Sequence, residues 1–90
     1  MSNIEEIKVF LNRIKRIFPN ATLRLEVKEY NDTYIVDIAP IEVYNNPKYI
    51  LLEKEFRDKF ESKNPNASIV FVSECSLLRI DKNNIKIEIL

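Results

Sequence analysis

The 90-residue chain contains no glycine, and this absence limits the turns that it can form. At an average usage of about 7%, a chain of this length would carry roughly six glycines. Turns that need a positive φ angle must therefore use another residue, and asparagine is the next best. We expect asparagine-based turns, because asparagines occur where the regular patterns break: Asn31, Asn45, Asn46, Asn64, Asn66, Asn83 and Asn84.

Two missing residue types also exclude several kinds of reactive site. Phosphate-binding loops use glycine so that backbone N–H groups can converge on a phosphate, and this chain has none. It has no histidine either, which excludes Ser-His and Cys-His nucleophiles within the chain. Cys75 is the single cysteine, so neither an intrachain disulfide nor a Cys/His zinc site can form. We predict no catalytic residue, no metal and no cofactor, and hence a protein that is not an enzyme.

One polar stretch has the oxygen spacing of the start of a calcium loop. Residues 81–84 read Asp-Lys-Asn-Asn, which places side-chain oxygens at alternate positions. A calcium loop also needs a central glycine and a distal glutamate at fixed spacing, and both are missing. A hairpin turn is therefore the better interpretation of this stretch.

Length and charge place the chain among small soluble domains. Ninety residues make one domain, 1–90, and 46% of them are hydrophobic. The 14 basic and 14 acidic residues give a formal net charge of +0. This balance argues against nucleic acid as a partner, because phosphate neutralisation provides most of the affinity of such proteins. The first residues do not read as a signal peptide, and no apolar run is long enough to span a membrane. We therefore predict a cytoplasmic protein with no membrane contact.

Two helices are predicted from apolar residues that recur on one helical face. The first covers residues 3–18, begins with a capping box of Ser2 and Glu5, and ends before Pro19. The second covers residues 47–62, with Asn46 as its N-cap and Pro47 at its first position. The apolar faces are formed by Ile4, Ile7, Leu11, Ile14 and Phe18 in the first helix and by Tyr49, Leu52, Phe56 and Phe60 in the second.

Alternating apolar and polar residues predict the strands. Residues 23–28 and 34–39 form a β-hairpin, with its turn at residues 30–33, and Pro40 is expected at a bulge or an edge. Residues 68–73 are apolar without alternation, which suits a strand covered on both faces or one with a face in an interface. A second hairpin is predicted from residues 77–80 and 85–89, joined by residues 81–84.

The predicted order is therefore α-β-β-α-β-β-β, which indicates an α+β fold of two layers. We expect an antiparallel sheet of four to five strands with the two helices on one face. Residues 19–23 match residues 65–69 at the same offset that relates Phe10 to Phe56. This similarity indicates either an αββ internal duplication or a helix-to-strand connector used twice, and the sequence leaves both open.

The function that we expect is contact with another protein. The chain would be a small non-enzymatic protein-interaction or self-associating module, with a protein partner or a second copy in a homodimer. If the last strand lies at the sheet edge, it offers a template for pairing with another chain. The candidate interaction edge consists of Ile85, Ile87, Ile89 and Leu90.

Two other functions remain as alternatives. The first is weak nucleic-acid binding through the basic end of the first helix, although the basic residues lack aromatic partners for base stacking. The second is a carboxylate-based enzyme or ligand site at Asp37, whose pKa would rise if its face of the strand were covered. We expect that face to be open to water, as for Arg24 and Glu26. The candidate phosphate contacts are Lys8, Arg13, Lys15 and Arg16.

Overall fold

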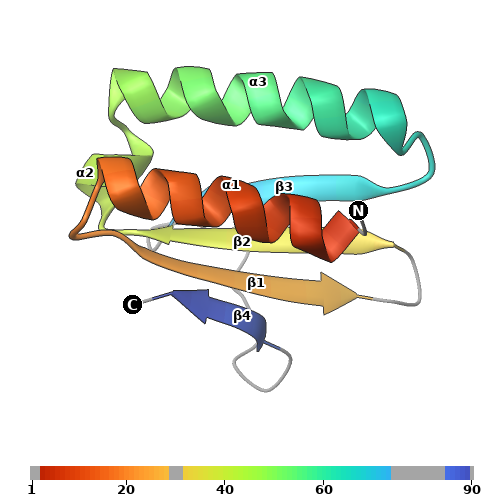
Figure 1. Cartoon of the computed structure of the whole chain (residues 1–90), viewed down its shortest axis with the longest axis horizontal. Coiled ribbons are helices and arrows are strands. Elements are labelled where there is room, and N and C mark those ends of the chain that lie inside the picture. Colours follow the sequence, from red (N-terminus) through yellow and green to blue (C-terminus); the bar gives the residue numbers. More distant parts are fainter. Residues whose placement is uncertain (1–2, 29–31, 74–84, 90) are drawn as a thin grey trace.

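The computed structural model describes residues 3–28, 32–73 and 85–89, and places two long helices over one face of a four-stranded sheet (Figure 1). The predicted α+β class with both long helices on the same face is confirmed. A short helix, α2, was not predicted. The elements in chain order are α1 (Asn3–Ile17), β1 (Thr22–Lys28), β2 (Thr33–Ala39), α2 (Ile41–Tyr44), α3 (Pro47–Lys63), β3 (Ser68–Ser73) and β4 (Ile85–Ile89).

The sheet is mixed, so the prediction of a purely antiparallel sheet is wrong. Its strand order, β3-β2-β1-β4, places β1 and β2 at the centre and β3 and β4 at opposite edges. β1 is antiparallel to both of its neighbours, with Leu25 opposite Val36 of β2 and Ile87 of β4. β3 is parallel to β2, with Phe71 opposite Val36. Parallel neighbours need a long connection, and α3 provides it between β2 and β3.

β1 and β2 form the predicted hairpin, and its register runs from Thr22 opposite Ala39 to Lys28 opposite Thr33. The predicted second hairpin has a different outcome. Its first strand, residues 77–80, and its turn lie outside the described residues. Among the described strands, β4 pairs with β1, so the predicted hairpin stays a prediction.

Among the described residues, no asparagine has a positive φ angle, contrary to our expectation. Asp32, which precedes β2, has a φ angle of 51° and is the residue with a positive φ angle in the described part of the chain. A short polar side chain tolerates this left-handed region better than most residues do. The predicted positions Asn31, Asn83 and Asn84 lie outside the described residues. The prediction is wrong at three caps with negative φ angles, Asn45, Asn46 and Asn64.

Pro40 also differs from its prediction. β2 is an inner strand and ends at Ala39, so Pro40 lies neither at a sheet edge nor at a bulge. It occupies the N-cap position of α2, where it follows the last ladder residue. Proline is tolerated at this point because the strand has already ended and no ladder hydrogen bond is lost.

The core lies between the helices and the sheet. α1 buries four of its apolar side chains there, and α3 buries Tyr49 and Phe60 completely or nearly so. Ile4, Phe18, Leu52 and Phe56 from the predicted apolar faces pack against the core but remain partly exposed. Each large apolar side chain that is fully buried in this core stabilises the fold by about 1.5–3 kcal/mol. The fully buried sheet residues beneath the helices are Leu23, Leu25, Val36 and Ile38.

The two matched connections have the same turn. The Ala21 N–H donates to the Phe18 carbonyl at 2.9 Å, and the Ala67 N–H donates to the Asn64 carbonyl at 3.0 Å. The strands that follow are placed differently, because β1 is an inner strand and β3 is an edge strand. Duplication and repeated use of a connector therefore both remain open.

Candidate interaction surfaces

β4 lies at the edge of the sheet, with β1 as its neighbour among the described strands (Figure 1). Ile87 and Ile89 lie opposite Leu25 and Leu23, and both pack partly buried against the core. Leu90 and the side chain of Ile85 lie outside what the structure describes. The candidate edge therefore carries apolar side chains on its helix-covered face.

The opposite face of β4 continues a row of charges that crosses three strands. Arg24 of β1 lies directly opposite Asp37 of β2 and Glu88 of β4. Its Nε donates to Glu88 Oε2 at 2.8 Å, and its Nη1 lies 3.6 Å from Asp37 Oδ2. The charges therefore alternate along the row, negative, positive and negative.

Asp37 faces away from the helices, but it is not fully open to water. Its side chain is 14% exposed and lies beside the Arg24 guanidinium. Glu26, on the same face, is completely buried, and its Oε2 lies 3.7 Å from Lys28 Nζ. The expectation that this face is wet is therefore wrong for Glu26. Asp37 is a partner in an ion pair, which gives it a structural role.

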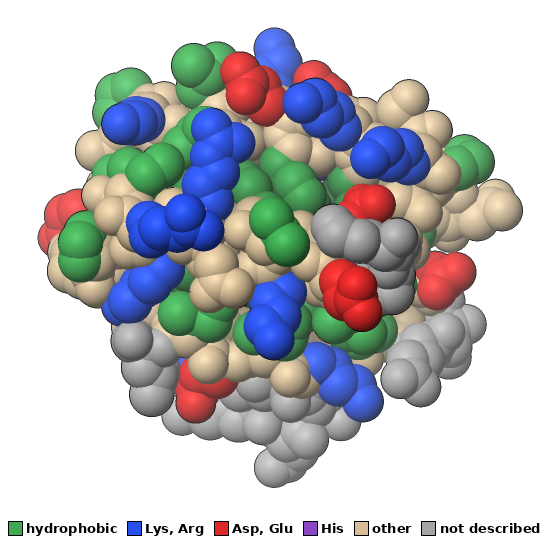
Figure 2. Space-filling view, in the orientation of Figure 1, with side chains coloured by type: hydrophobic (Ala, Val, Ile, Leu, Met, Phe, Trp, Pro, Cys, Tyr) green, Lys and Arg blue, Asp and Glu red, His purple; other side chains and the backbone are tan. Residues whose placement is uncertain are grey.

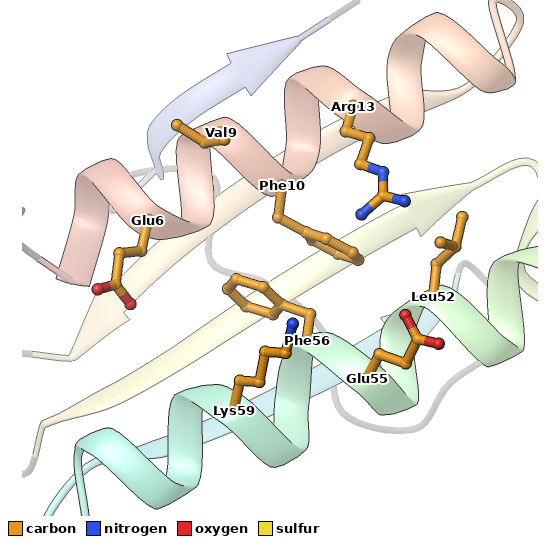
Figure 3. Close-up of a pocket in the computed structure, with 8 residues that line it drawn as sticks. All are labelled: Glu6, Val9, Phe10, Arg13, Leu52, Glu55, Phe56 and Lys59. Carbon is orange, nitrogen blue, oxygen red and sulfur yellow. The ribbon is translucent and has the colours of Figure 1, made fainter.

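A groove runs between α1 and α3 on the side away from the sheet (Figure 3). The rings of Phe10 and Phe56 extend toward each other from the two helices and stack with centroids 4.4 Å apart. Lys63 Nζ lies 3.9 Å from Glu6 Oε1 and links the helices. Charges of both signs therefore surround an apolar floor, and they select neither an anion nor a cation. The groove is lined by Glu6, Val9, Phe10, Arg13, Leu52, Glu55, Phe56 and Lys59.

A polar cluster lies where α2 and α3 meet β3. The hydroxyl of Tyr49 donates to Glu53 Oε1 at 3.1 Å, and Glu53 Oε2 lies 3.7 Å from Arg57 Nη1. The hydroxyl of Tyr44 donates to the backbone carbonyl of Phe71 at 3.1 Å. Burial raises the pKa of Tyr49 far above its ordinary value, and burial likewise raises the pKa of Glu53. Tyr49 is thus a neutral hydrogen-bond donor to the Glu53 carboxyl group, and the cluster joins these elements.

The structure does not gather the four candidate phosphate contacts into one site. Lys15 Nζ donates to the Ala21 carbonyl at 2.7 Å, whereas Lys8, Arg13 and Arg16 are exposed. Arg13 lines the groove that also contains acidic residues. Lys8 and Arg13 point about 140° apart around the axis of α1, given the turn of an α-helix. Figure 2 shows basic side chains spread over this side of the molecule, with apolar and neutral side chains between them.

Within residues 3–28, 32–73 and 85–89, no group of three or more acidic or cysteine side chains is placed to hold a metal ion. No helix among these residues is both long and apolar enough to cross a membrane. Cys75 and the polar stretch at residues 81–84 lie outside the described ranges.

Comparison of the chain with protein-family models, curated proteins and solved structures found no match.

Proposed function

We propose that this protein is a small non-enzymatic interaction module that pairs through the outer edge of β4 with an extended strand of another chain. The observation that supports this most strongly is the position of β4 at the end of the sheet. An edge strand presents backbone N–H and C=O groups on its outer side, and a further strand can bind them. Main-chain hydrogen bonds would provide the affinity, and the alternating side chains would provide the specificity.

The side chains of β4 suit such pairing. Ile87 and Ile89 are only partly buried, so a strand added beside them would remove more of their apolar surface from water. Glu88 is exposed on the other face, opposite Arg24, whereas the pairing of β4 with β1 shifts register at Lys86. An incoming strand that alternates apolar and charged residues would therefore place apolar residues beside Ile87 and Ile89, toward the helices, and a charged residue beside Glu88.

The other sheet edge supports pairing less well. β3 has its Phe71 carbonyl bound by the Tyr44 hydroxyl at 3.1 Å. A strand added at this edge would have to fit around the Tyr44 side chain. β4 is therefore the edge that we assign to binding.

The composition supports contact as the function, because histidine and glycine are absent. Most nucleophilic sites use histidine, and phosphate-binding loops use glycine. We also propose a cytoplasmic location, which suits a chain with a single cysteine.

The test uses backbone amide NMR on the intact chain. The spectrum is recorded over a concentration series of the protein, and then with a panel of extended peptides that alternate isoleucine with charged residues. We expect shift changes and slower amide exchange at residues 85–89, with the amides of β3 as an internal control. If β4 amides stay unchanged under every condition, the proposed function is wrong.

Nucleic-acid binding through α1 is the second hypothesis, and it has less support. Its four basic residues diverge, and one of them is bound to the Ala21 carbonyl. Titration of a labelled oligonucleotide at low and moderate salt tests it, because phosphate contacts weaken as salt rises. We expect no salt-sensitive binding.

A further inference from the structure

We infer that Tyr44 closes the outer edge of β3 and thereby keeps two copies of this protein from pairing through that strand. The inference concerns the sheet edge opposite β4 and does not depend on the proposed binding at β4 (Figure 1). It follows from the ladder between β2 and β3, from the residues of β3, and from the hydrogen bond between the Tyr44 hydroxyl and the Phe71 carbonyl.

The ladder determines which backbone groups of β3 face outward. The Ser68 N–H donates to the Asp32 carbonyl at 2.9 Å, and Ser68 lies opposite Thr33. In a parallel ladder, the N–H and C=O of one residue point to the same side, and successive residues alternate between the two sides. Ser68 and every second residue after it therefore point toward β2. The residues of β3 whose backbone groups point outward are Ile69, Phe71 and Ser73.

Tyr44 occupies the middle one of these three outward positions. Its hydroxyl reaches the Phe71 carbonyl from α2 and donates to it at 3.1 Å. A strand added beside β3 would need this carbonyl as an acceptor, and it would also need the space that the Tyr44 ring fills. With the middle position taken, the outward groups on either side of it cannot form a continuous ladder.

The Tyr44 side chain is held in this position by packing. Its ring centroid lies 6.1 Å from that of Tyr49, which is completely buried, and the ring itself packs partly buried against the core. Burial also raises the pKa of Tyr44 above its ordinary value of 10.0. The hydroxyl therefore stays protonated and remains a donor to the Phe71 carbonyl at neutral pH.

β3 lacks the charges that commonly protect an edge strand. Its six residues read Ser-Ile-Val-Phe-Val-Ser and include neither a charged residue nor a proline. Natural edge strands resist pairing through charges, prolines, bulges or a covering element. Uncharged segments of this length that are rich in β-branched and aromatic residues pair readily with identical segments. Without Tyr44, the strand that adds at this edge is therefore β3 of a second copy.

The test compares wild type with Tyr44→Phe and Tyr44→Ala by light scattering over a concentration series. Tyr44→Phe releases the Phe71 carbonyl and should raise the self-association constant by roughly tenfold, the effect of about one hydrogen bond. Tyr44→Ala also removes the ring and should raise it further. Circular dichroism verifies folding, and Tyr44→Phe decides the result if Tyr44→Ala does not fold. Self-association of Tyr44→Phe equal to that of wild type would overturn the inference.

Tyr49→Phe is the matched control, because it removes a neighbouring hydroxyl that donates to Glu53 and not to a strand. It should lower stability without raising self-association. If it associates as strongly as Tyr44→Phe, loss of stability is the cause and Tyr44 does not protect the edge. Adding Val70→Lys, at a position that is 37% exposed, to Tyr44→Phe should reverse the association, because a charge on an edge strand opposes pairing. Association that persists in this double variant would contradict pairing through β3.

Amide hydrogen exchange locates the pairing and separates this inference from the proposed function. In the Tyr44 variants at high concentration, exchange should slow at the outward amides of Ile69 and Phe71, with the amide of Val70, which points toward β2, as the internal control. Slowing at residues 85–89 instead would support the proposed function and overturn this inference. Slowing at β3 together with a β4 edge that binds no strand would overturn the proposed function and leave this inference in place.

Discussion

The ring of Phe10 in α1 stacks on the ring of Phe56 in α3, with centroids 4.4 Å apart and planes inclined by 17° (Figure 3). Both rings also meet Phe71 of β3 edge-on, at 5.9 Å and 6.5 Å. These three phenylalanines join both long helices to the edge strand β3. The stacked pair also forms the floor of the interhelical groove, so helix packing explains this groove without a ligand.

Replacing Phe10 by alanine should lower the free energy of unfolding by about 3–5 kcal/mol, because the ring is nearly fully buried. Phe56→Ala should cost less, since Phe56 is partly exposed. Urea unfolding of the two single variants and the double variant measures their coupling, which should be about 0.5–1.5 kcal/mol for stacked rings. Val9→Ala, at a groove residue that is 56% exposed, is the control and should change stability by less than about 0.5 kcal/mol. Strictly additive costs would contradict direct stacking.

Glu53 should make stability depend on pH. Burial raises its pKa above the ordinary 4.5, against the opposing effects of the Tyr49 hydrogen bond and Arg57. The folded state therefore holds this proton more tightly than the unfolded state does. The stability from Glu53 is fully present below pH 4.5 and is lost as pH rises through the folded pKa.

Glu53→Gln tests this, because glutamine keeps a carbonyl acceptor for the Tyr49 hydroxyl and does not titrate. Urea unfolding of both proteins from below pH 4.5 to neutral pH gives the comparison. The stability of the variant relative to wild type should rise with pH. Glu55→Gln, at an exposed position of the same helix, is the matched control. The prediction fails if the Glu53→Gln difference is flat or falls with pH.

The N-cap of α3 gives a prediction on helix stability. Asn46 Oδ1 accepts a hydrogen bond from the Lys48 N–H at 2.9 Å, as expected for a cap before Pro47. Asn46→Ala should lower the free energy of unfolding by about 1 kcal/mol, because that N–H then loses its acceptor. Asn46→Asp keeps the acceptor and adds a negative charge that the helix N-terminus favours, so it should be at least as stable as wild type. Thermal unfolding of the three proteins tests the order, and an alanine variant equal to wild type would contradict it.

The local elements could be predicted from the sequence because their signals are local. Apolar periodicity and the residues Pro19, Asn46 and Pro47 located α1 and α3 to within about two residues, which is the usual uncertainty of helix ends. The hairpin of β1 and β2 could be predicted as well, from the alternation of apolar and polar residues along both strands. The parallel pairing of β3 with β2 could not be predicted, because it depends on where α3 returns the chain and not on the residues of either strand.

The row of Asp37, Arg24 and Glu88 shows a second feature that the sequence could not predict, which is the register between neighbouring strands. A turn symmetric about Asn31 and Asp32 would place Arg24 opposite Ala39, whereas the structure places it opposite Asp37. Alternation indicates which residues share a face but not which of them are neighbours. It also does not indicate whether a face is covered, and for this reason Glu26 was expected in water although it is fully buried.

Arg24 should contribute more to stability than its exposed partner Glu88. Arg24→Met leaves Asp37, which is 14% exposed, without the guanidinium beside it and should lower the free energy of unfolding by about 1–3 kcal/mol. Glu88→Gln keeps the Arg24–Asp37 contact and removes a pair with a 41% exposed partner, so it should cost less than about 1 kcal/mol. The cost of Glu88→Gln should shrink further in 1 M salt, where charges are screened beyond about 3 Å.

Urea unfolding at low protein concentration measures these costs in the isolated chain, without a contribution from association. Arg16→Met, which removes an exposed arginine from α1, is the control for the loss of one positive charge. If Arg24→Met costs no more than Arg16→Met, the row does not stabilise the monomer. Glu88 would then not be held in place by Arg24.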